Sequence, residues 1–324
     1  TTEIYTLSLH DALPIYLGPL SDDYFRLLES EIGMWAGLYG KQGLQHKDMV
    51  FDSIYVGGGT PSIAPPDYWE RTLKMITSVF NILPGAEITI EANPATFDRS
   101  KAISWRRSGF NRVSLGGQSF DDGELNSMGR IYRRAAIQDG VQVLKETGLS
   151  NISMDLLVGY PGQTMNSVEK SIQETVACDP CHISAYLLEI KNTSVIEGLM
   201  TSGRMQPMDE DLAADIYEMV CSELAEYGYM QYEISNFCKP GKESAHNMKY
   251  WTDGFFLGIG TGAHGRLEKM RYANHSVLDQ YKTDVVAGKF PWDNTVELDL
   301  HTRMVEALLM GLRLNQGLDL MAMS

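Results

Sequence analysis

Residues 112–159, RVSLGGQSFDDGELNSMGRIYRRAAIQDGVQVLKETGLSNISMDLLVG, decide the expected fold. Two short apolar runs, at 112–119 and 151–159, are predicted as strands, and between them apolar residues recur at helical spacing until Gly148. The positions that mark this helix are Ile137, Val141 and Leu144. A strand, a helix and a second strand in this order predict two parallel strands joined by a right-handed crossover.

The same rhythm extends in both directions along the chain. Further strands are predicted in DSIYVGGGTPS at 52–62, at 87–93 and at 182–190. Further helices are predicted at 21–35, 69–80, 98–108 and 168–176. The apolar strands lack a clear period-two alternation, which is typical of parallel strands that are covered on both faces. The sequence therefore predicts an α/β protein with a parallel sheet.

Beyond about residue 200 the alternation of strands and helices stops. Apolar positions between Leu212 and Leu224 predict an amphipathic helix, and a stretch rich in glycine, aromatic residues and histidine follows, from Tyr229 to Arg271. Two more helices are expected near 276–288 and 297–312. We expect a larger α/β region over residues 16–200 and a smaller region over 201–324, and the missing terminal cap suggests truncation of that second region.

The composition excludes several classes of protein. The 324 residues carry a formal net charge of -15, and Lys and Arg are scattered along the chain, which argues against nucleic-acid partners. No run reaches the roughly 20 apolar residues that a membrane span needs, so stable membrane insertion is not expected. Four cysteines are too few for a disulfide framework in a chain of this length. Reduced thiols and the lack of a recognisable signal peptide predict a cytoplasmic protein.

The first fifteen residues, TTEIYTLSLHDALPI, resemble a translated sequencing adaptor. A genuine N-terminal arm is the alternative. We interpret residues 1–15 as adaptor-derived and exclude them from the prediction of the fold.

Polar residues interrupt the predicted strands where apolar ones belong. The strand ends carry GGGTP at 57–61, then Glu91, Gln118 and Asp155. Each has a simpler interpretation by itself, as a tight turn, a helix cap or the partner of a structural Lys or Arg, and no Gly-Lys-Ser/Thr follows to make a phosphate loop. Ligands of parallel α/β sheets bind beyond the carboxyl ends of the strands, so together these residues predict one polar ligand site.

Seven segments, taken in order, resemble one family. They are VGGGTPS, ITIEANP, RVSLGGQSFDD, MGRIY, NISMDLLVGYPGQT, QYEISNFCKPGKESAHNMKYW and LGIGTGAHG. The chain is similar, from about Tyr24 to Leu320, to the radical S-adenosylmethionine (SAM) proteins that comprise haem chaperones and oxygen-independent coproporphyrinogen III oxidases. The resemblance implies a partial (β/α)6 barrel with a smaller mixed α/β C-terminal region. Gly117 departs from the pattern, where valine is expected.

The resemblance also implies a set of SAM-binding residues. Gly57, Gly58, Gly59 and Thr60 match the loop whose backbone lies against the methionine end of SAM. Glu91 matches an acidic contact, and Gln118 and Asp155 match polar contacts to the ribose. Arg130 matches the partner of the SAM carboxylate, for which a planar guanidinium is suited. Leu157 is expected against the adenine.

The family holds a 4Fe-4S cluster with C-x-x-x-C-x-x-C on the loop after its first strand, and this chain has no such motif. YFRLLESEI at 24–32 resembles the helix that follows this loop. We therefore expect the first strand and the cluster loop to be missing, with the 4Fe-4S cluster belonging to the intact protein only. No metal ligand is assigned, no catalytic residue is assigned, and the chain is predicted to be inactive in radical chemistry.

Two further motifs contain histidine. CDPCH at 178–182 has the C-x-x-C-H spacing of covalent haem attachment, but Cys178 is expected to end a helix and His182 to begin a buried strand, so we favour a coincidental pair of buried thiols. HNMKYW at 246–251 resembles the H-N-x-x-Y-W motif of the haem chaperones. Here His246 and Tyr250 are predicted to contact haem, and the alternative is a packed pair that satisfy one another. His264 is interpreted as structural.

These features leave three hypotheses of function. The first is a haem chaperone that binds haem and SAM and passes haem to an unknown acceptor protein. The second is an oxygen-independent coproporphyrinogen III oxidase. The third is an inactive fragment. The motif at 246–251 favours the chaperone.

Overall fold

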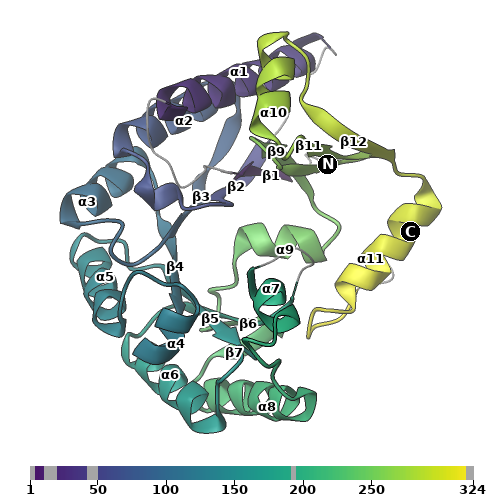
Figure 1. Ribbon diagram of the computed structural model, residues 1–324. Coiled ribbons are helices and arrows are strands. Elements are labelled where there is room, and N and C mark those ends of the chain that lie inside the picture. The colour runs from purple at the N-terminus through teal and green to yellow at the C-terminus, as the bar shows by residue number, and fades with distance from the viewer. Residues whose placement is uncertain (1–3, 11–19, 42–49, 191–194, 319–324) are drawn as a thin grey trace.

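The structure is a computed structural model that describes residues 4–10, 20–41, 50–190 and 195–318. Its strands form one curled sheet in the order β12-β11-β10-β9-β1-β2-β3-β4-β5-β6-β8-β7 (Figure 1). Seven neighbouring strands within it, β9 and β1 to β6, run parallel. They are β9 (Phe255–Ile259), β1 (Ile4–His10), β2 (Val50–Gly57), β3 (Asn81–Ala92), β4 (Arg112–Gln118), β5 (Ile152–Val158) and β6 (His182–Leu187). The expected partial α/β barrel is confirmed.

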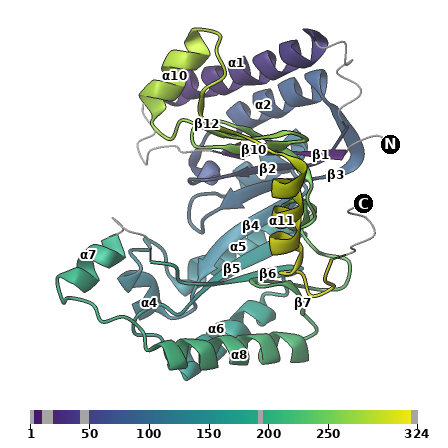
Figure 2. The same ribbon diagram turned by 90° about the vertical axis from the view of Figure 1, so that its right-hand side faces the viewer.

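Helices cover the outer face of the parallel strands (Figures 1 and 2). In chain order they are α1 (Leu20–Lys41), α2 (Pro66–Val79), α3 (Arg99–Ser108), α5 (Arg134–Glu146) and α6 (Met165–Ala177). Side chains cap the N-termini of two of them. Asp98 accepts a hydrogen bond from the Lys101 backbone N–H at the start of α3, and Thr164 forms a capping box with Ser167 at the start of α6. All five match helices predicted from the sequence.

The strands alternate between polar and apolar residues, so the expectation of strands without alternation is wrong. On β4, Arg112 and Ser114 face the lumen of the barrel, while Val113 and Leu115 belong to the apolar core under the helices. β6 follows the same pattern with His182, Ser184 and Tyr186 on the lumen side. Small serines made the pattern weak in the sequence. The barrel therefore has a polar interior rather than two apolar faces.

β1 corrects a second expectation. Residues 4–10 pair in parallel with both β2 and β9, as shown by the registers of Leu7 with Ile54 and of Leu7 with Leu257. A strand therefore occupies the place of the first barrel strand, which was predicted to be missing. Its residues, IYTLSLH, include types that favour strands, but the adaptor-like composition of 1–15 argues against a strand in the sequence. The interpretation of residues 1–15 as adaptor-derived stays a prediction.

The region after residue 200 flanks the barrel on both sides. α8 (Glu210–Glu226) packs on α6, and β7 (Met230–Glu233) and β8 (Asn236–Cys238) extend the sheet antiparallel to β6. At the other edge β9 leads into β10 (His264–Leu267), β11 (Met270–Asn274) and β12 (Trp292–Glu297). The predicted C-terminal helices are α10 (Leu278–Val286) and α11 (Leu300–Gly311). Three short helices were not predicted as such: α4 (Asp122–Ser127), α7 (Val195–Thr201) and α9 (Ala245–Trp251).

A buried carboxylate ties the first helix to the C-terminal strands. Glu31 on α1 accepts hydrogen bonds from the Gly260 backbone N–H at 2.8 Å, from Asn274 Nδ2 at 2.8 Å and from the Tyr281 hydroxyl at 2.6 Å. Burial raises the pKa of Glu31 to about 7, although these hydrogen bonds act in the opposite direction. The glycine-rich segment around Gly260 thus has a structural role in this region.

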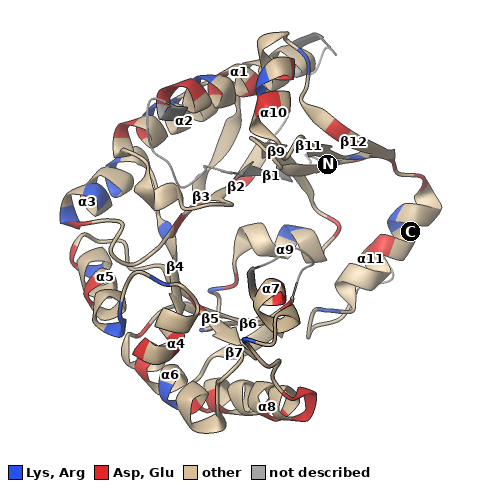
Figure 3. Cartoon of the chain, viewed as in Figure 1, with Lys and Arg blue, Asp and Glu red and all other residues tan. Residues whose placement is uncertain are grey.

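Charged residues of both signs occur on the helices that surround the barrel. Acidic residues are distributed over these helices, among them α8 and α10, and Lys and Arg are interspersed with them (Figure 3). In the parts of the chain that the structure describes, no helix combines the length and the apolar character that crossing a bilayer requires.

Candidate functional site

The carboxylate of Glu91 is held at the junction of three elements. It lies at the end of β3, where its Oε1 accepts a hydrogen bond of 2.8 Å from the Tyr55 hydroxyl of β2. Its Oε2 accepts a hydrogen bond of 3.1 Å from the backbone N–H of Gly58 in the loop that follows β2. Burial raises the pKa of the Glu91 carboxyl, and the two hydrogen bonds favour the ionised form. Glu91 is therefore fixed in orientation at the carboxyl ends of the strands.

The glycines of the β2 loop are required by close approach. A Cβ at Gly57 would lie 2.6 Å from Glu91 Oε1 and 2.6 Å from Tyr55 Cε1. Gly58 adopts φ 111°, in the left-handed region that favours glycine. The Lys101 ammonium supports the loop from the other side, since it donates to the carbonyl oxygens of Ser62 at 2.9 Å and Ile63 at 3.1 Å. The loop presents backbone, not side chains, towards Glu91.

A cavity of about 410 Å³ opens over the carboxyl ends of the strands, and we call it the strand-end cavity. Six of the predicted SAM-binding residues line it: Gly59, Thr60, Glu91, Gln118, Arg130 and Asp155. Gln118 adopts φ 67°, an unusual conformation for a non-glycine residue, at the point where β4 ends. The Nε atom of Arg130 is buried and has no hydrogen-bond partner among the described residues. A buried guanidinium N–H beside a cavity is suited to bind a carboxylate.

Asp155 lies on the lumen face of β5, and its Oδ1 accepts a hydrogen bond of 3.2 Å from the Ser114 hydroxyl. Burial raises the pKa of Asp155 to about 7, and the nearby Glu91 carboxylate adds to the increase. Two carboxyl groups in one polar cavity provide acceptors for an ammonium group or for hydroxyl groups. Neutral pH lies within the titration range of one of them.

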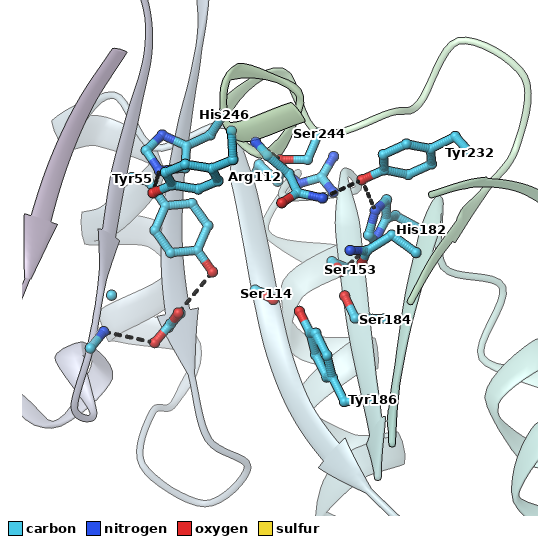
Figure 4. Close-up of a pocket in the computed structure, with 16 residues that line it drawn as sticks. Tyr55, Arg112, Ser114, Ser153, His182, Ser184, Tyr186, Tyr232, Ser244 and His246 are labelled. Atoms are coloured by element: carbon cyan, nitrogen blue, oxygen red, sulfur yellow. Dashed lines mark hydrogen bonds between the residues drawn. The ribbon is translucent and has the colours of Figure 1, made fainter. Parts of the chain in front are cut away.

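A second cavity, of about 350 Å³, continues into the barrel and is called the interior cavity (Figure 4). Four residues line both this cavity and the strand-end cavity: Tyr55, Glu91, Ser114 and Tyr186. Gly57 and Gly58 line the interior cavity beside Glu91. The two cavities therefore meet at the hydrogen-bonded pair of Tyr55 and Glu91.

Polar residues that the sequence did not single out form the deep wall of the interior cavity. The side chain of Arg112 is 3% exposed, and its ion pair with Glu87 is long, at 3.4 Å. His182 Nδ1 lies 2.8 Å from the Ser153 hydroxyl, and its Nε2 lies 2.9 Å from the Tyr232 hydroxyl. Burial lowers the pKa of His182 well below its ordinary value, so its imidazole is neutral. The period-two pattern of the strands was the signal that could have identified this wall.

His246 and Tyr250 line the same cavity from α9. Ser244 accepts a hydrogen bond from the Asn247 backbone and caps the helix, which places His246 and Tyr250 one turn apart. His246 Nε2 lies 2.9 Å from the Tyr250 hydroxyl, and the His246 ring stacks on the Tyr55 ring with centroids 4.7 Å apart. His246 is 3% exposed. The two residues are thus hydrogen-bonded to one another, and they also reach the wall of the predicted SAM site.

Comparison with known proteins identifies the family. The profile of the Radical SAM superfamily matches residues 42–175. The chain is 33% identical over 300 residues to the "Heme chaperone HemW" of Bacillus subtilis, covering 92% of this chain and 77% of that protein. The chain belongs to the HemW family of radical SAM proteins. The HemW protein of Lactococcus lactis is 34% identical over 265 residues, with coverage of 82% of this chain and 69% of the relative.

The solved structures agree with this fold. The structure titled "Coproporphyrinogen III oxidase (HemN) from Escherichia coli is a Radical SAM enzyme." superposes with a TM-score of 0.84 at 20% identity. It covers 99% of this chain and 78% of that chain. Its likeness shows that the curled sheet and its C-terminal extension form the fold of a HemN-like radical SAM protein.

Two other residues considered from the family pattern, Leu157 and Gly117, do not line the two cavities. Leu157 lies on the lumen face of β5 with Asp155, but it lines neither of the two cavities. Gly117 lies at an irregularity in the register between β4 and β5, where a Cβ would approach the Asp155 carbonyl oxygen to 3.2 Å. Glycine therefore suits the local backbone at this departure from the family pattern.

The cysteines of this HemW-family chain do not fit a 4Fe-4S cluster. Cys178 caps the end of α6, Cys181 precedes β6, and Cys238 pairs opposite His182, at the end of the strands away from Glu91. The prediction of buried thiols at Cys178 and Cys181 is wrong, because both residues are partly exposed at the turn between α6 and β6. Residues 11–19, which follow β1, contain no cysteine and lie outside the described residues. No group of three His, Cys, Asp or Glu side chains that could hold a metal occurs among the described residues. The C-x-x-C-H motif is equally unsuited to haem, because both nitrogens of His182 are engaged.

Proposed function

We propose that this protein is a haem chaperone of the HemW type, which binds SAM and haem and passes haem to an acceptor protein. The observation that carries the proposal is the contact between the two predicted sites. The ring of His246, from the H-N-x-x-Y-W motif, stacks on Tyr55, and Tyr55 donates a hydrogen bond to Glu91. Relatives at 33% and 34% identity are named heme chaperones, which supports the same function.

In this proposal SAM occupies the strand-end cavity. The unpartnered Nε of Arg130 fits the carboxylate of SAM, and the backbone at Gly57 to Thr60 lies against its methionine end. Glu91 accepts from the ammonium group, while Gln118 and Asp155 contact the ribose hydroxyls. Leu157 is the proposed adenine contact on the same face of β5. SAM is thus the ligand that this polar site recognises.

Haem contact is proposed for the hydrogen-bonded pair of His246 and Tyr250. Tyr250 lines the interior cavity and also a third pocket beside α9, so the pair can transmit a change at Tyr55 to a bound porphyrin. The chain carries no thiolate set for a cluster, so no step of radical chemistry is part of the proposal. The proposed function also includes a cytoplasmic location and transfer of haem to an acceptor protein of unknown identity.

The test is a pair of titrations on the purified chain. Calorimetry with SAM should detect binding that Arg130→Ala weakens by about tenfold, since one charge-assisted contact is worth ~1.4 kcal/mol or more. Hemin titration should give a Soret band. Binding of neither ligand would contradict the proposal and favour an inactive fragment. If the chain binds coproporphyrinogen III but not hemin, the oxidase hypothesis is favoured.

A further inference from the structure

A third pocket, of about 370 Å³, lies between α9, the strands β9 to β11 and α11, and we call it the aromatic pocket. Its apolar lining is made by Tyr250, Trp251, Phe256, Tyr272 and Met310. The Tyr250 and Phe256 rings pack edge to face with centroids 4.9 Å apart. This volume is within the range of about 300 to 1,000 Å³ that is typical of small-molecule sites. α9 and α11 contact one another across its edge.

Charge around the aromatic pocket is opposite in sign to that of the whole protein. Four Lys or Arg residues line it against two acidic ones, although the chain carries a net charge of -15. Arg271 forms an ion pair of 3.0 Å with Glu306, and both side chains remain partly exposed. Arg313 is exposed and lies over the Trp251 ring at 5.5 Å, and no carboxylate of the described residues pairs with it. Lys249 and Arg266 form ion pairs with Asp52 and Asp253. The rim therefore offers an anionic ligand the guanidinium group of Arg313 and the partly exposed one of Arg271.

His264 places an imidazole at the same pocket. It begins β10, lines the pocket and is exposed to solvent. No residue that the structure describes forms a hydrogen bond or an ion pair with its imidazole. It differs in this from His246, whose ring is buried and hydrogen-bonded to Tyr250. An imidazole of this kind can coordinate iron without breaking an existing interaction.

We propose that the aromatic pocket binds the iron porphyrin, with His264 as the axial ligand of the iron. The proposal rests on the proposed function and names the site of its cargo. The planar macrocycle packs between Trp251, Phe256 and Met310, and its two carboxylates pair with Arg271 and Arg313 at the rim. Tyr250 contacts the porphyrin edge, and His246 positions Tyr250 from the interior cavity. His264, interpreted from the sequence as structural, thereby becomes the iron ligand.

Hemin titration of the full chain tests the ligand. His264→Ala should shift the Soret band and weaken hemin binding by at least about tenfold, because the axial bond is lost. Added imidazole should restore the spectrum of the unaltered protein. The matched control is His301→Ala, an exposed histidine on α11 outside the pocket, which should leave spectrum and affinity unchanged. An unaltered spectrum in His264→Ala overturns the assignment.

A second measurement separates the pocket from the iron ligand. Metal-free protoporphyrin should bind His264→Ala and the unaltered chain equally, while Met310→Glu should weaken both porphyrins by placing a charge in the apolar wall. Normal binding of both porphyrins by Met310→Glu overturns the pocket. If the unaltered chain binds no hemin at all, the proposed chaperone function itself fails. If it binds hemin and these variants have no effect, only the location of the site fails.

Discussion

The ring of His246 stacks on the ring of Tyr55, with centroids 4.7 Å apart and an angle of 25° between the planes. His246 is in the C-terminal region and Tyr55 is on the second strand of the barrel. Since Tyr55 also donates to Glu91, one aromatic contact joins the proposed haem-contact helix to the proposed SAM site. Variants of Tyr55 therefore test the coupling between the two ligands.

Tyr55→Phe should weaken SAM binding by about tenfold, because Glu91 loses the hydroxyl that orients its Oε1. The phenylalanine ring keeps the stacking on His246, so hemin binding in the absence of SAM should be unchanged. Calorimetry with each ligand measures both effects. Tyr227→Phe, at an exposed tyrosine on the end of α8, is the control. Equal SAM affinity in Tyr55→Phe and the unaltered protein would count against Glu91 as a SAM contact.

Gly57→Ala should abolish detectable SAM binding or reduce it more than tenfold, by roughly 1.4 kcal/mol or more. Its Cβ would lie 2.6 Å from Glu91 Oε1, which must move away. Gly37→Ala on α1 is the matched control, since nothing lies within 4 Å of its new Cβ. That substitution should be neutral or stabilising by ~0.5–1 kcal/mol in urea unfolding. A well-folded Gly57→Ala with normal SAM affinity contradicts the proposed cradle.

SAM affinity should increase with pH across neutrality. The pKa of Asp155 is raised to about 7, and hydroxyl donors of the ribose favour its ionised form. SAM binding should therefore release a proton near pH 7, which calorimetry in buffers of different ionisation enthalpy detects. Asp155→Asn cannot ionise and should bind SAM weakly at every pH. A pH dependence that persists in Asp155→Asn would assign the proton to another group.

Stability should fall as pH rises towards neutrality because of Glu31. Its folded-state pKa is raised to about 7, so its stabilising contribution is fully present below the ordinary pKa and is lost as pH rises through 7. The loss is of the order of 3 kcal/mol between about pH 4.5 and about pH 7. Urea unfolding of Glu31→Gln and the unaltered chain at about pH 5 and about pH 8 measures the difference. An identical pH dependence in both proteins would exclude Glu31 as its source.

Reconstitution with iron and sulfide should not give a SAM-cleaving cluster. The four cysteines lie at 178, 181, 221 and 238, and all four are far along the chain from the first strand. Reduction in the presence of SAM should form no 5′-deoxyadenosine by chromatography, because a 4Fe-4S cluster needs thiolate ligands. A variant with all four cysteines replaced by serine should behave identically. Production of 5′-deoxyadenosine that depends on these cysteines would show an unforeseen cluster site.

The sequence by itself determined the order of the barrel elements and the identity of the polar strand ends. Parallel strands and their crossover helices have strong local patterns, so the strands β2 to β6 and the helices α1, α2, α3, α5 and α6 were predictable. Carboxyl ends of parallel strands meet at one edge, and this rule predicts that Glu91, Gln118 and Asp155 lie together, as they do in the strand-end cavity. The strand at residues 4–10 was misjudged because its composition suggested that it was not part of the protein, and the short helices α4, α7 and α9 were not predicted.

Only the tertiary structure decided which residues complete the site. The polar lumen wall of Arg112 and His182 arises from alternation on three strands that pair in register, and serine hides that alternation in a sequence. The contact of His246 with Tyr55 joins positions 191 residues apart, and the aromatic pocket joins α9 to α11. Contacts of this kind depend on how the C-terminal region closes over the barrel. Local periodicity carries no information on that closure, whereas side-chain packing fixes it.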